Sequence, residues 1–124
     1  MSVARRARLA RVALLVLAIA GAVLAFSPRG VIPPDLGTGI GDKAAHAVFA
    51  AIAGAMLAFA FPLQSAALVL VGIVVVAALV EIAQPLVGRG ADVEDAWMTV
   101  LGACSGYCFV RLVFDAAARA LRAP

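Results

Sequence analysis

Four long apolar runs without an acidic or basic residue, apart from one histidine, constrain the fold of this chain more than any other feature. They cover residues 12–26, 44–61, 65–80 and 96–110. A helix needs about 17–25 predominantly apolar residues to cross a bilayer, and each run reaches or approaches that length with its flanks. The pattern predicts four transmembrane helices, the first of them over residues 9–27.

The composition favours a membrane over water as the solvent of these helices. Of the 124 residues, 65% are hydrophobic and 14% are charged, whereas soluble domains are about 45–50% apolar and about 25% charged. Too few polar residues remain to cover a soluble fold of this length. We therefore predict an all-α integral membrane protein, with residues 1–124 forming a single domain that is a bundle of four transmembrane helices.

The first apolar run has a second interpretation, as a cleaved signal peptide. It follows a basic segment, RRARLAR, and contains small residues, as the hydrophobic region of a signal peptide does. The run is on the long side of the 7–15 residues that are typical of such a region, which favours a retained helix. Cleavage would leave the orientation of the other three helices unchanged.

Basic residues predict the orientation of the bundle. Positive charge concentrates before the first run and after the last, including a short basic tail at residues 116–124, so the positive-inside rule places both termini in the cytoplasm. The net charge of +3 is then a topology signal, and we expect no nucleic acid as a partner. The basic residues at the termini are Arg5, Arg6, Arg8, Arg11, Arg111, Arg119 and Arg122.

Polar residues near the last three helices gather at one membrane face, the outer one in this topology. Asp42, Lys43 and His46 share a helical stripe, as do Glu81 and Gln84. A charge in mid-membrane costs about 2.5–3.5 kcal/mol, so Glu81 should face a donor such as His46, Lys43 or Arg89. The candidate ligand-binding residues are Asp42, Lys43, His46, Glu81, Gln84, Arg89, Asp92 and Asp95.

These positions carry a family resemblance. The segments DKAAHAVF, EIAQPLVGRGADVED and GACSG resemble the VanZ-like family of small bacterial membrane proteins, which is named for a protein associated with resistance to the glycopeptide teicoplanin. The resemblance covers roughly residues 41–106 and implies a multi-pass protein of the bacterial cytoplasmic membrane. The matching positions are Asp42, Lys43, His46, Glu81, Gln84, Arg89, Asp92, Asp95, Gly102 and Gly106.

One position departs from the family pattern. Four residues after Asp95, where the family has Asn, this chain has Thr99, which keeps a hydroxyl but lacks the amide with its two donors. If the Asn orients a ligand or a reacting group, activity would be altered here. The resemblance implies a role in glycopeptide resistance or in the envelope, without a defined chemical reaction.

Three functions are compatible with the polar cluster. The first is a pocket with Lys43 and Arg89 at its rim, binding or modifying an amphiphile such as a lipid-linked envelope intermediate or a lipidated glycopeptide. The second is an enzyme acting on a lipid-linked phosphate or ester, with His46 and Glu81 as an acid–base pair. The third is a transporter subunit, which would require an oligomer because four helices enclose too small a pore. We expect membrane lipids as partners, and no cofactor or metal, since no dense ligand motif is present.

Structural roles compete with these functions. Asp42 could cap the second helix, and the segment from Asp92 to Asp95 resembles a capping box. Lys43 could extend to the headgroups, and His46 could simply bond Glu81. Small residues, Gly102 and Gly106 on the fourth helix and Ala47, Ala51 and Ala55 on the second, predict helix packing within the bundle or in a homo-oligomer. Cys104 and Cys108 are expected to be packing residues.

Overall fold

The computed structural model describes residues 3–26, 42–88, 90 and 92–122, and most of these residues are helical. The elements are α1 (Val3–Phe26), α2 (Asp42–Ala60), α3 (Ala66–Ala83), the short 3₁₀ helix η1 (Gln84–Val87) and α4 (Val93–Ala120). No strand occurs in these ranges. The all-α prediction is confirmed, and each of the four apolar runs lies in a helix of its own.

Two of the helices are long and apolar enough to cross a membrane. One extends over Ala66–Val87, which joins α3 to η1, and the other is α4. The apolar part of α2, His46–Ala60, is shorter. Length and composition among the described residues thus support two membrane-spanning helices.

Capping and turn residues mark the start of α3 and the end of η1, which follows it directly. Ser65 is its N-cap, and the Ser65 hydroxyl accepts a hydrogen bond of 3.3 Å from the Leu68 N–H. Pro85 stands at the first turn of η1, where its missing N–H is tolerated. Gly88 then ends η1 with a φ of 76°, a left-handed conformation that glycine adopts without steric cost.

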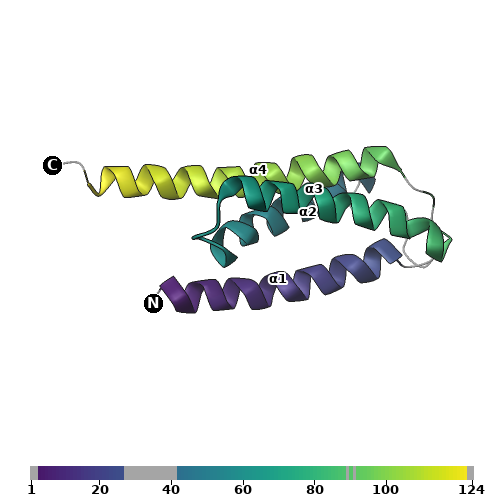
Figure 1. The fold of residues 1–124 in the computed structure, drawn as a ribbon, viewed down its shortest axis with the longest axis horizontal. Helices are drawn as coiled ribbons and strands as arrows, with labels where there is room; N and C mark the ends of the chain where they lie inside the picture. The colour runs from purple at the N-terminus through teal and green to yellow at the C-terminus, as the bar shows by residue number, and fades with distance from the viewer. Residues whose placement is uncertain (1–2, 27–41, 89, 91, 123–124) are drawn as a thin grey trace.

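Two helix ends lie beyond the apolar runs. α1 begins at Val3, before the basic segment RRARLAR, and α4 continues to Ala120, so most of the expected basic tail is helical. Arg111 lies within α4, and its guanidinium Nη1 donates to the Pro62 carbonyl at 2.8 Å. Beyond the other helices, the C-terminal part of α4 projects alone (Figure 1, yellow).

Helices α2 and α4 form the most extensive contact of the bundle. A Cβ added to Gly102 would overlap the backbone of Ala47, one on Gly106 would overlap Ala51, and one on Gly54 would overlap Ala103. Only glycine permits such a close approach. The small-residue packing expected from the sequence therefore occurs within the bundle, between α2 and α4.

The other helices add to this pair. α1 packs on α2, with Gly21 against the Phe49 ring. Away from α1, Ile73 of α3 joins a core cluster with Ala50 of α2 and Ala103 of α4. Helix α2 therefore lies between α1 and α4.

Large side chains lie outside and small ones inside. Apart from Ile73 and Tyr107, the buried apolar residues in the described ranges are alanines. Leu, Val, Ile and Phe side chains cover the exterior of every long helix, and on α3 Leu68, Val71 and Leu79 are each about 60% exposed. An exterior so apolar is typical of a surface that contacts lipid.

Two arginines hold the turn between α2 and α3. Arg11 of α1 donates from Nε to the Ala60 carbonyl at 2.9 Å, and its guanidinium lies 5.3 Å from the centre of the Phe61 ring. From α4, Arg111 donates to the Pro62 carbonyl. Arg11 satisfies a carbonyl that the end of α2 leaves without an intrahelical partner, and Arg111 satisfies a carbonyl of the turn itself. This end of the bundle also carries the start of α1 and the end of α4 (Figure 1).

Candidate functional site

Polar side chains from three helices meet at the end of the bundle opposite those arginines, around the start of α4. Asp92 is the N-cap of this helix and has the extended backbone that such a position requires, with φ −126° and ψ 103°. The Asp92 carboxylate accepts a hydrogen bond of 2.9 Å from the Glu94 N–H. The capping role expected for Asp92 is confirmed.

Glu81 of α3 completes the cap of α4. Its Oε1 accepts a hydrogen bond from the Asp92 N–H. In a capping box, a residue in the first turn of the same helix accepts from this N–H. Here the acceptor comes from a neighbouring helix, so the Glu81 carboxylate joins the end of α3 to the start of α4 and compensates the positive end of the α4 dipole.

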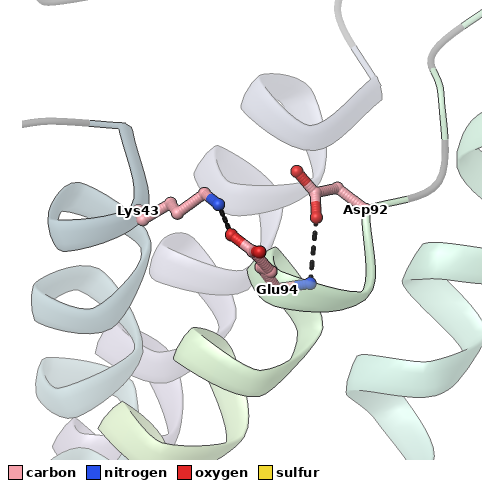
Figure 2. A network of polar contacts seen from close by, with 3 residues as sticks. All are labelled: Lys43, Asp92 and Glu94. Atoms are coloured by element: carbon pink, nitrogen blue, oxygen red, sulfur yellow. Dashed lines mark hydrogen bonds and ion pairs between the residues drawn. The ribbon is translucent and has the colours of Figure 1, made fainter.

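Lys43 of α2 reaches the same turn of α4. Its Nζ forms an ion pair with Oε2 of Glu94, whose N–H is the one bonded to Asp92 (Figure 2). The Lys43 and Glu94 side chains are 45% and 67% exposed, so solvent weakens the pair to about 0–1 kcal/mol. This contact adds little stability but places two opposite, solvent-exposed charges beside the start of α4.

Asp95 and Gln84 are more buried than Lys43 and Glu94. Gln84, the first residue of η1, is 3% exposed. Asp95 is half-buried, and its Oδ1 is buried without a hydrogen-bond partner in the part of the chain that the structure describes. Because Glu81 accepts from the Asp92 N–H that a capping-box Asp95 would take, Asp95 is not needed for that bond.

His46 is half-buried one turn into α2. The polar contacts described at this end do not include it, and the described partner of Glu81 is the Asp92 backbone rather than His46 or Lys43. Arg89, the third expected donor, lies outside the described residues, as does the side chain of Asp42, which begins α2. The expected His46–Glu81 pair therefore stays a prediction.

Thr99 is half-buried in α4, one turn after Asp95. Glu94 was not among the residues predicted for the site, yet it connects the Lys43 and Asp92 contacts. Its position between Asp92 and Asp95, which were both predicted as site residues, could have indicated its role. A residue two places after an N-cap is well placed to donate its N–H to the cap, which leaves its side chain free to pair elsewhere.

The donor set at this end is suited to polar and ionic recognition. It presents an ammonium group, several carboxylates and the start of a helix, beside exposed apolar side chains such as Ile82, Leu86 and Val93. Within the described ranges, no group of three or more His, Cys, Asp or Glu residues is arranged to hold a metal ion. Cys104 and Cys108 are both free thiols in α4.

No family model matches the chain, and no match to a curated protein or to a solved structure is found.

Proposed function

We propose that all four helices cross the membrane and that both termini face the cytoplasm. The distribution of side chains supports this topology, since the described core is made mostly of alanine while large apolar residues lie outside. On α1, exposed Leu9, Val12, Val16 and Ile19 recur every three or four residues along one face and would lie against lipid. The arginines at the α2–α3 turn then lie at the cytoplasmic surface.

We further propose that the opposite, extracytoplasmic end binds an amphiphilic component of the cell envelope. The observation that carries this proposal is the convergence of Lys43, Glu81 and Glu94, from three helices, on the first turn of α4. A charged or hydrogen-bonding headgroup would contact these residues while its hydrocarbon chain lay along the exposed apolar surface of α3. A lipid-linked envelope intermediate and a lipidated glycopeptide both have this chemistry.

The resemblance to the VanZ-like family extends the proposal to teicoplanin-type resistance in a bacterial membrane. Binding is favoured over acid–base catalysis, because the described contacts do not join His46 to Glu81: the described partner of the Glu81 carboxylate is the Asp92 N–H. Modification of the bound component remains part of the proposal, with His46 as the titratable group that the described contacts leave available.

The substitution His46→Asn tests the site. Asn keeps a hydrogen-bonding side chain but cannot titrate at physiological pH. If His46 belongs to the binding site, cells that carry the variant should lose teicoplanin resistance while quantitative blotting shows normal protein abundance. The matched control is Gln64→Ala, at an exposed residue in the turn at the opposite end.

Full resistance with Asn at position 46 would contradict a functional role for this histidine. A loss of resistance that merely follows a loss of protein would contradict it too, since that result is expected of a structural residue. Retention of resistance by Gln64→Ala confirms that the effect depends on position.

A further inference from the structure

Helix α4 is longer than the hydrocarbon core of a membrane. Its 28 residues at about 1.5 Å per residue extend roughly 42 Å, against about 30 Å for the hydrocarbon core. The excess amounts to about two turns. Figure 1 shows that the C-terminal end of α4 is the part that extends past the other helices.

The C-terminal part of α4 and the turn that follows it carry one mostly basic stripe. Arg111, Asp115 and Arg119 of α4 and Arg122 of the turn follow one another at intervals of four, four and three residues, which places them on one side of this end. Asp115, Ala118, Arg119 and Arg122 line an open hollow there. Arg111 is bonded to the Pro62 carbonyl, whereas Arg119 and Arg122 are exposed.

The rest of this segment is apolar. Leu112 and Val113 are 64% and 50% exposed, and Leu121 is 88% exposed. A helix end with arginine on a narrow face and alanine together with a few large apolar residues on the others is suited to the boundary between headgroups and acyl chains. A soluble acidic partner would satisfy the arginines but would leave the exposed leucines in water.

We propose that Arg119 and Arg122 form a binding surface for the phosphate headgroups of anionic phospholipids. The two guanidinium groups are three residues apart, close enough to contact a single phosphate, and planar guanidinium donors match phosphate oxygens in pairs. The Asp115 carboxylate lies on the same stripe and opposes anion binding. This surface is distinct from the envelope-binding site, and it depends only on the membrane placement proposed above.

Lipid retention measured by native mass spectrometry tests this surface. Protein in neutral detergent is mixed with equal amounts of phosphatidylglycerol and phosphatidylcholine that have identical acyl chains. We expect wild type to retain the anionic lipid preferentially. The double substitution R119Q/R122Q should lower that preference by about five- to twenty-five-fold, because each arginine at an anionic surface contributes about five-fold.

Two further variants separate a specific surface from diffuse charge. Asp115→Asn removes the acid from the stripe and should raise the preference for phosphatidylglycerol, an increase that misfolding cannot produce. R5Q/R6Q removes two charges from α1 at the same end of the bundle and should have a clearly smaller effect than R119Q/R122Q.

Equal retention of the two lipids by wild type would overturn the proposal. So would an R5Q/R6Q effect as large as that of R119Q/R122Q, or no increase with Asp115→Asn. Because detergent solution has no inner and outer face and the assay includes no antibiotic, its result is independent of the topology and of the resistance experiment.

Discussion

Glu81 holds two helices together through a single oxygen atom. Its carboxylate accepts a hydrogen bond from the Asp92 N–H. In a capping box, this acceptor would be a residue of the first turn of α4 itself. The sequence predicted that Glu81 must face a donor on another helix, because an unpaired carboxylate at this depth is costly. The donors that it suggested were the side chains of His46, Lys43 and Arg89, whereas the described donor is a backbone N–H, which occurs at every residue except proline and leaves no mark in the sequence.

Replacing Glu81 should therefore destabilise the bundle. Glu81→Gln keeps an oxygen that can accept from Asp92 but loses the negative charge at the start of α4, so we expect a loss of about 1 kcal/mol in the free energy of unfolding. Glu81→Ala also leaves the Asp92 N–H without this acceptor and should cost about 2 kcal/mol. Unfolding in mixed detergent micelles, monitored by helical circular dichroism, gives both values.

Glu94→Gln is the matched control for this measurement. It removes a carboxylate from the same turn of α4, but one whose ion pair with Lys43 is exposed, so the loss should stay below about 1 kcal/mol. Equal stability of Glu81→Ala and Glu94→Gln would contradict the capping role of Glu81.

At the scale of helices, the uncharged runs predicted which segments form helices better than they predicted where each helix begins and ends. The runs located α1 to α4 because a continuous apolar segment without turn residues leaves few alternatives to a helix. They placed the end of α4 near residue 110, whereas it lies at Ala120. A charge ends an apolar run but does not end a helix, and Arg111 is accommodated by a carbonyl from a turn far away in the sequence.

The pairing of helices was only partly predictable. Small residues on α2 and α4 indicated packing surfaces but not whether they met each other or a second copy of the chain. The structure places Gly106 against the Ala51 backbone and leaves open space around Gly72 of α3. Two glycines in equally helical settings thus differ completely in their surroundings.

This difference predicts opposite effects of one substitution. Gly106→Ala would force a methyl group into the Ala51 carbonyl, so α2 and α4 must separate and the unfolding free energy should fall by about 1–3 kcal/mol. Gly72→Ala meets no neighbour and should raise it by about 0.5–1 kcal/mol through helix propensity. Detergent unfolding of both variants checks the pair, and a Gly106→Ala protein as stable as wild type would show that the close contact is absent.

At the scale of the whole molecule, the two ends of the bundle have different chemistry. Arginines hold the α2–α3 turn at one end, and mixed charges around the start of α4 occupy the other. The sequence predicted the asymmetry from charge counts along the chain. Contacts such as Lys43–Glu94 could not be predicted, because they depend on how the helices are rotated about their axes.

Cysteine labelling tests the orientation of this asymmetry. In a background with Cys104→Ala and Cys108→Ala, we expect Gln64→Cys in the α2–α3 turn to react with a membrane-impermeant maleimide only after the cells are permeabilised. Gly37→Cys, which lies outside the described residues, should react in intact cells. Labelling of position 64 in intact cells would reverse the topology and place the Lys43 end at the inner leaflet.

The contact between α2 and α4 also has a consequence for biosynthesis. The two helices are separated in the chain by α3, so α2 leaves the ribosome before the glycines of its partner have been translated. In the four-span topology proposed above, its small-residue face must stay in the insertion machinery or in lipid until Gly102 and Gly106 arrive, and the arginine contacts of the α2–α3 turn cannot be completed before Arg111 follows. We expect nascent chains that stall before residue 102 to be recognised as unassembled and degraded.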